Sequence, residues 1–283
     1  MSNGIAGSEN MKQARASFEQ GERAREVGNL AEAVQAYEQA IEMSPKFLLP
    51  LQKLAEVSET QEKWADSITY YRQMIALKPE LPAPHLRLAR ILRKQESFSD
   101  SVDEYQKAIE LKHDWGAGVY REMGEVASAA SRFDVATVAY SKAIELKHDW
   151  GAGVYAKLAH AYLQQHQYDE AIANYSKAIE LQPNNPAFLI AISNAYLEKG
   201  WFDEAIQWLQ RAANLKDDAP GIYKSLGDIF AQKGQIDKAV EAYQRVLSIK
   251  PDSPAICRIL GDLMLKQNKD SEALVYYRKA ILS

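Results

Sequence analysis

The residues best suited to chemistry are five histidines and one cysteine, and the histidine spacing predicts no metal site. His113 and His148 are each followed by an aspartate within two stretches of identical sequence. Loops in neighbouring copies of one helical unit lie about two helix diameters apart, roughly 20 Å, which is too far to share an ion. His160 and His166 are six residues apart and fall on different faces of a helix. We therefore expect no metal and no cofactor.

The other reactive residue types also lack a catalytic arrangement. Cys257 cannot form an intrachain disulfide, fits a reducing compartment and occupies an inward helical position, which favours a core role. The segments 116–118 and 151–153 read Gly-Ala-Gly, but they follow no strand and lack the third glycine of a dinucleotide fingerprint. No Ser/His/Asp set or carboxylate pair can be assembled. The sequence favours a non-catalytic protein.

Charged pairs at helical spacing are the remaining candidates. A base is followed four residues later by an acid at three places: Arg121/Glu125, Lys224/Asp228 and Arg258/Asp262. One interpretation is a ladder of alternating charge that holds an extended peptide. The other is an ion pair that supports its own helix by a few tenths of a kcal/mol. For a single pair the second interpretation is favoured, and the repetition on one wall keeps the first open.

Composition narrows the classes of partner. The chain has 34 Lys+Arg against 38 Asp+Glu, a formal net charge of −4, so it offers no basic excess to neutralise nucleic-acid phosphates. The N-terminus lacks the basic and apolar regions of a signal peptide, and no apolar run is long enough to cross a bilayer. We expect a soluble cytoplasmic protein that binds neither nucleic acid nor membrane.

The chain is built from copies of one unit. The stretch KAIELKHDWGAGVY occurs at residues 107–120 and again, letter for letter, at 142–155. Regular helix breaks extend this register over most of the chain after an N-terminal extension, residues 1–13. The predicted units are 14–47, 48–81, 82–115, 117–150, 152–185, 186–219, 220–253 and 254–283. Single glycines, Gly116 and Gly151, lengthen two of the joints.

Small and large side chains alternate at fixed positions of the unit. Position 8 is occupied by Gly21, Ala55, Ala89, Gly124, Ala159, Ser193, Gly227 and Gly261. Position 20 is occupied by Ala33, Ser67, Ser101, Ala136, Ala171, Ala205, Ala239 and Ala273. Position 24 is tyrosine in every unit except the sixth, which has Leu209. The pattern predicts an all-α chain of helix–turn–helix units whose two helices touch at positions 8 and 20. In the fifth unit we expect helices over 153–165 and 169–181.

This pattern, with alanine frequent at position 27 and proline at position 32, resembles the tetratricopeptide repeat (TPR). The family's proline is kept as Pro45, Pro79, Pro183 and Pro251. The resemblance implies a right-handed superhelical solenoid in which positions 2, 5, 9, 12 and 13 of each first helix line a concave groove. It also implies a scaffold that binds a partner protein or peptide there. Phe18 and Glu22 stand where the family's chaperone-binding clamps carry lysine and asparagine, so chaperone binding is not expected.

Reading the groove positions gives a set of candidate binding residues. The most basic part is formed by Arg90, Arg93, Lys94 and Arg121, where we expect an acidic segment of a partner to dock. The full predicted set is Arg90, Arg93, Lys94, Arg121, Glu125, His160, Asn194, Lys224, Asp228, Arg258 and Asp262.

The two ends of the array suggest alternative functions. The first unit carries Ser17 and Gln20 on its outer face, as a solvated cap should. The last helix, about 270–282, offers Leu274, Tyr277 and Ile281 on the side that would receive another unit. Two alternatives therefore stay open: self-association through this helix, or a recruiting module of a larger glycosyl-, sulfo- or methyltransferase.

Overall fold

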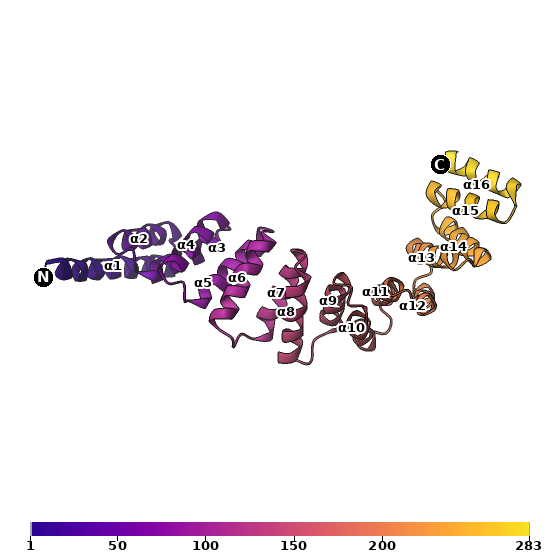
Figure 1. Ribbon diagram of the computed structural model, residues 1–283. Helices are drawn as coiled ribbons and strands as arrows, with labels where there is room; N and C mark the ends of the chain where they lie inside the picture. The colour runs from indigo at the N-terminus through magenta and orange to yellow at the C-terminus, as the bar shows by residue number, and fades with distance from the viewer. Residues whose placement is uncertain (1, 283) are drawn as a thin grey trace. The chain divides into compact units, whose positions relative to one another are not determined.

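The computed structural model describes residues 2–282, with side chains from residue 9 onward, and within this range it contains sixteen α-helices and no strand (Figure 1). The helices are α1 (Ser2–Glu26), α2 (Leu30–Met43), α3 (Leu48–Thr60), α4 (Trp64–Leu77), α5 (Pro82–Lys94), α6 (Phe98–Leu111), α7 (Ala117–Ala129), α8 (Phe133–Leu146), α9 (Ala152–Gln164), α10 (Tyr168–Leu181), α11 (Pro186–Glu198), α12 (Phe202–Leu215), α13 (Pro220–Gln232), α14 (Ile236–Ile249), α15 (Pro254–Lys266) and α16 (Asp270–Leu282). None of these helices is both long enough and apolar enough to cross a membrane.

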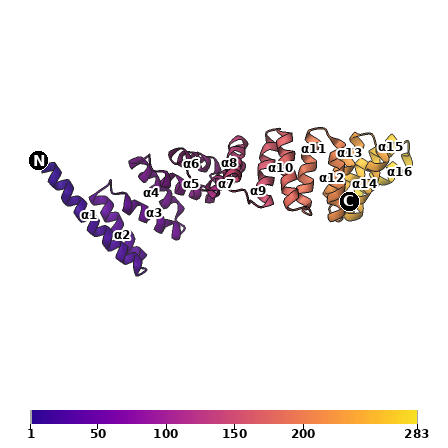
Figure 2. The same cartoon turned by 90° about the horizontal axis from the view of Figure 1, so that it is seen from below.

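The helices pack in consecutive pairs, which confirms the predicted all-α repeat fold. Residues 1–146 (α1–α8, the N-terminal module) and 147–283 (α9–α16, the C-terminal module) form two compact units. Within the C-terminal module, α10, α11 and α12 lie side by side (Figure 2). The two helices expected in the fifth unit are α9 and α10, each beginning one residue before its predicted start.

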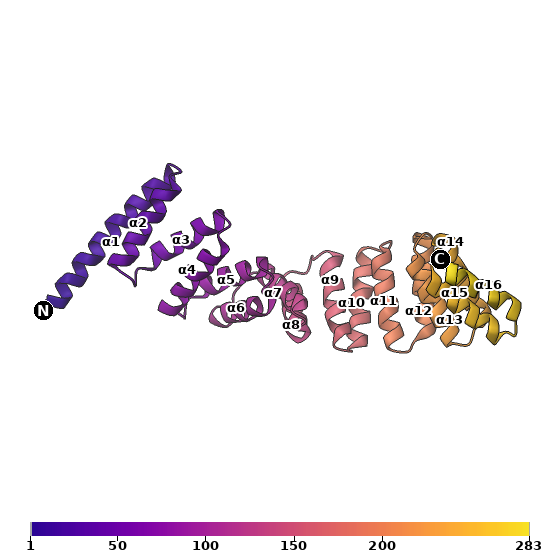
Figure 3. The same cartoon turned by 90° about the horizontal axis from the view of Figure 1, so that it is seen from above.

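Local sequence explains where the helices start. Four first helices begin on a proline, at Pro82, Pro186, Pro220 and Pro254, because proline's fixed φ suits the first helical position and its missing N–H costs nothing there. In the first unit, α1 continues past the C-terminal end of α2 (Figure 3). The repeat register begins at residue 14, whereas α1 begins at Ser2.

The small residues let the two helices of a unit approach closely. A Cβ added to Gly124 would lie 2.7 Å from the ring of Tyr140, and one added to Gly227 would lie 2.7 Å from the ring of Tyr243. Position 8 therefore lies directly under the tyrosine of position 24. Position 20 also contacts position 8, because the Ser101 hydroxyl donates a 2.6 Å hydrogen bond to the carbonyl of Ala89.

The turn between paired helices contains one residue in the left-handed region. Gly200 has a φ of 82° at this place, whereas Glu96 adopts a φ of 57° in its own unit. Left-handed backbone costs roughly 1–2 kcal/mol for a residue with a Cβ. The fold therefore imposes this turn even where the sequence does not favour it.

Successive units in the C-terminal module are joined by a repeated polar contact. The Lys199 and Lys233 side chains pair with Asp169 and Asp203, each aspartate lying 30 residues earlier at the start of a second helix. Gln267 continues the series with a 2.7 Å hydrogen bond to Asp237. The aspartates thus bind the next unit as well as complementing the helix N-terminus.

Candidate functional site

The predicted groove positions line two adjoining hollows in the C-terminal module. The first, of about 410 Å³, is lined by Leu163, Gln164, His166, Asn194, Leu197 and Glu198. The second, of about 320 Å³, is lined by Leu197, Glu198, Phe202, Ser225, Asp228, Ile229 and Gln232. Leu197 and Glu198 border both, so the hollows are adjacent. We call the surface of α9, α11 and α13 that carries them the first-helix face.

Two of the predicted residues, Asn194 and Asp228, lie in these hollows, one in each. The predicted His160 is exposed on α9, at position 9 of its unit, which is the position that Asn194 occupies in the next unit. Sequence reasoning named position 12 as lining but did not single out Leu163 or Leu197. Both leucines occupy position 12 of their units, and this repeat position could have identified them from the sequence.

Position-24 tyrosines fix carboxylates on the first helices. The Tyr243 hydroxyl donates a 2.6 Å hydrogen bond to Asp228, and the Tyr277 hydroxyl donates a 2.7 Å bond to Asp262. Burial and the bond to Asp228 raise the pKa of Tyr243, so the phenol stays a donor at neutral pH. The acids at position 9 are therefore anchored to the repeat scaffold beneath them.

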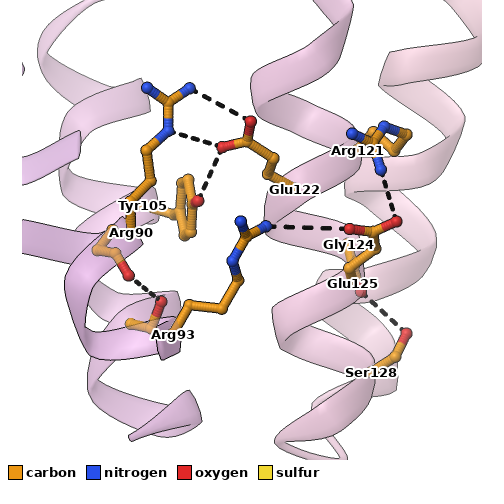
Figure 4. A network of polar contacts seen from close by, with 10 residues as sticks. Arg90, Arg93, Tyr105, Arg121, Glu122, Gly124, Glu125 and Ser128 are labelled. Atoms are coloured by element: carbon orange, nitrogen blue, oxygen red, sulfur yellow. Dashed lines mark hydrogen bonds and ion pairs between the residues drawn. The ribbon is translucent and has the colours of Figure 1, made fainter. Parts of the chain in front are cut away.

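The three arginines of the basic cluster in the N-terminal module are already paired with glutamates (Figure 4). Arg90 on α5 makes two bonds to Glu122 on α7, of 2.8 Å from Nε and 3.3 Å from Nη2. The Tyr105 hydroxyl donates a further 2.9 Å bond to the same carboxylate. Burial disfavours the charge of Arg90, but its bonds to Glu122 raise the pKa of the guanidinium. Sequence reasoning missed Glu122 because its repeat position lies outside the family's groove positions.

A second carboxylate balances the rest of this cluster. Glu125 lies 2.6 Å from Arg121 and 4.0 Å from Arg93. Lys94 places its Nζ 4.4 Å from the centroid of the Trp64 ring. Arg90, Arg93 and Arg121 therefore belong to ion pairs with Glu122 and Glu125 that join two repeats, and Lys94 lies over an aromatic ring.

The three predicted base–acid pairs have different outcomes. Arg121 pairs with Glu125, and Lys224 pairs with Asp228 at 2.7 Å. Arg258 is exposed and forms no ion pair with any residue between 9 and 282. Two of the three pairs thus fit the helix-supporting interpretation, and both Lys224 and Arg258 are exposed.

The described side chains offer no metal site: between residues 9 and 282 no group of three His, Cys, Asp or Glu could hold an ion. His85, the buried histidine, instead lies 2.6 Å from Glu104 and 3.2 Å from the carbonyl of Pro79. Trp115 donates a 3.0 Å bond to the carbonyl of Ala108, so it packs at its joint.

Comparison with known families defines the class of this protein. Tetratricopeptide-repeat models match residues 18–82 and 162–227, and a TPR repeat model matches residues 227–268. Together with the sixteen paired helices of residues 2–282, these matches show that the chain belongs to the tetratricopeptide-repeat family. Proteins of this family are typically non-catalytic interaction scaffolds. No curated protein sequence matches the chain at a significant level.

Several solved structures share the fold. MamA is 26% identical, with a TM-score of 0.52, covering 56% of this chain and 92% of its own. YrrB, described as a TPR protein with an unusual peptide-binding site, is 20% identical with a TM-score of 0.52 and covers 70% and 97%. The structure of Naa15/Naa10 bound to HypK-THB gives 14% identity and a TM-score of 0.68, covering 95% of this chain and 42% of that one.

Proposed function

We propose that this chain is a non-catalytic scaffold that binds an extended segment of a partner protein across the first-helix face of the C-terminal module. The observation that carries the proposal is the pair of adjoining hollows, of about 410 and 320 Å³, that share Leu197 and Glu198. Structural neighbours include a protein described by its peptide-binding site and a subunit solved with a bound partner, which supports this class of function.

The chemistry of the face indicates how a segment would be held. Leu163 and Leu197 offer apolar contact to partner side chains. Asn194 is exposed beside them, and its amide can both donate to and accept from a peptide group. Farther along, Asp228 and the exposed Lys224 favour charged or backbone contacts. Because the wall is built on rigid helices, the ordering cost of binding falls on the ligand.

A binding measurement tests this proposal. A partner is isolated with the full chain, and its affinity is measured by calorimetry for wild type, Leu197→Glu and Asn194→Lys. Leu197→Glu should weaken binding at least tenfold because this leucine borders both hollows. Asn194→Lys, at an exposed site that leaves the core untouched, should weaken it by a smaller factor.

Leu181→Glu is the matched control, since Leu181 is 48% exposed at the end of a second helix and lies in neither hollow. Equal losses for Leu197→Glu and Leu181→Glu, with Asn194→Lys unchanged, would contradict the use of this face.

The basic cluster of the N-terminal module adds a docking site for an acidic segment. Arg90 and Arg121 already face Glu122 and Glu125, so incoming carboxylates must displace these glutamates. Charge reversal at Arg90 and Arg121 should reduce the affinity for the partner at least tenfold. It should also make that affinity less sensitive to salt concentration. Reversal of Lys107, exposed on α6, is the control. Unchanged binding by the Arg90 and Arg121 variants would contradict the acidic-segment proposal.

Self-association through α16 is a second candidate function. Leu274, Val275 and Ile281 are 56%, 64% and 82% exposed, although each is apolar. Light scattering should show a mass that rises with concentration, and Leu274→Lys should abolish that rise. A constant monomer mass at high concentration would refute this candidate.

A further inference from the structure

One repeat lacks an apolar side chain that every other repeat supplies. Position 28, in the last turn of the second helix, is a branched aliphatic residue in seven units: Ile41, Ile75, Ile109, Ile144, Ile179, Leu247 and Ile281. In the sixth unit this position is Ala213. Within the C-terminal module, Ile179 and Leu247 are buried in the core. Such a side chain normally contributes to packing at the end of a second helix.

The structure has a pocket where that side chain is missing. Its volume is about 550 Å³, and it lies between α12, α13 and α14. Ile206, Ala213, Leu226, Phe230 and Ala242 form an apolar floor, each less than a tenth exposed. Helix α13 packs against both α12 and α14 and separates them (Figure 1). We call this pocket the α12–α14 groove.

The groove is separate from the first-helix face. None of its lining residues borders either of the hollows described above. It also contains none of the residues that sequence reasoning selected. A ligand in the α12–α14 groove would therefore leave the first-helix face open.

One wall of the groove carries two side-chain amides that make no hydrogen bond within the described residues. Gln210 and Asn214 are exposed on α12, and neither side chain makes a hydrogen bond to the residues between 9 and 282. Four residues of helix rise about 6 Å, close to the ~6.7 Å that separates alternate residues of an extended chain. The two amides can therefore meet alternate peptide groups of one extended segment.

The charges of the groove balance. Lys238 and Arg245 are offset by Asp203 and Glu241 in the lining. Arg245 is engaged with Asp217, and Lys238 has its Nζ 5.6 Å from the centroid of the Phe230 ring. A site with an apolar floor and no net charge favours an uncharged segment over an acidic or basic one.

We propose that the α12–α14 groove binds a branched aliphatic side chain, leucine, isoleucine or valine, from an uncharged extended segment of a partner protein. That side chain takes the place that Ile179 and Leu247 take in the two neighbouring repeats. The amides of Gln210 and Asn214 hold the backbone of the segment on either side of it.

Ala213→Ile tests the proposal, because it restores the residue type of the other units and places a branched side chain in the groove. A display library of random twelve-residue peptides is selected on the full wild-type chain, and recovered peptides are measured on both proteins. We expect peptides that share one leucine, isoleucine or valine among uncharged residues. Their affinity should fall at least tenfold on Ala213→Ile, and also when the shared aliphatic residue of the peptide is replaced by alanine.

Two further variants keep the test decisive. Ala173→Ile, at an exposed alanine on α10, adds the same side chain outside the groove and should leave affinity unchanged. Ala213→Leu, which copies the seventh unit, serves if the isoleucine variant does not fold. The proposal is overturned if the recovered peptides bind the residue-213 variants as tightly as wild type. It is also overturned if the peptides that depend on residue 213 share a charged residue instead.

Discussion

Gly124→Ala should destabilise the fold although alanine is the better helix former. In α7 the new Cβ would lie 2.7 Å from Cδ1 and Cε1 of Tyr140 and 2.9 Å from Cγ. Tyr140 is 1% exposed, so its ring has little space into which it can retreat. Overpacking of this kind costs about 1–3 kcal/mol. The gain in helix propensity offsets roughly 1 kcal/mol of that cost.

The other repeats narrow the expected cost of Gly124→Ala. Ala89 lies opposite Tyr105 and Ala159 lies opposite Tyr175 at the equivalent positions, so a pair of helices can be built with an alanine under the ring. A small shift of Tyr140 therefore absorbs part of the clash. We expect a net loss of about 1 kcal/mol in the free energy of unfolding of the variant.

The same helix supplies the control. Gly118 has nothing within 4 Å of an added Cβ, so Gly118→Ala should stabilise the chain by about 0.5–1 kcal/mol. Urea unfolding followed by circular dichroism measures both variants. Gly124→Ala combined with Tyr140→Leu, which copies the leucine of the sixth unit, should recover stability relative to Tyr140→Leu alone. If Gly124→Ala stabilises the chain as much as Gly118→Ala does, the close approach of ring and glycine is wrong.

Three further predictions concern other contacts. Tyr243→Phe should lower the free energy of unfolding by about 1 kcal/mol, because it removes the bond to Asp228; an unchanged urea midpoint would contradict this. Glu96→Gly should raise the midpoint by the equivalent of about 1 kcal/mol, because glycine tolerates the φ of 57°, and a lower midpoint would count against strain in this turn. Burial opposes the charge of Glu22, but bonds from Arg25 and Tyr37 lower its pKa below 4.5. A lowered pKa stabilises the fold above pH 4.5, and this effect is lost on acidification, so the unfolding midpoints of wild type and Glu22→Gln should converge as the pH falls below 4.5.

The repeat architecture was predictable from the sequence because its signals are local and periodic. Side-chain size at positions 8, 20 and 24 is set by contacts inside one helical hairpin, and eight copies of the hairpin average out individual exceptions. Helix starts at Pro186 and Pro220 follow from the fixed φ of proline. The lining of the hollows by Asn194 and Asp228 also follows from the register.

Tertiary structure alone decided the partners of the charged side chains. Arg90 and Glu122 are 32 residues apart, and their contact depends on how far one unit is rotated and displaced relative to the next. The repeat pattern does not contain that offset, so sequence reasoning placed the arginine in an open basic wall.

The α12–α14 groove is a second feature that the sequence could not predict. Ala213 is visible in the sequence as a small residue among isoleucines, but a missing side chain gives no signal of its own. Whether its neighbours collapse into the space depends on packing from three helices at once. The sequence by itself determined which units form and which residues face inward, because those properties repeat along the chain. Only the tertiary structure decided where a pocket stays open and which charges are paired, because these depend on distances between units.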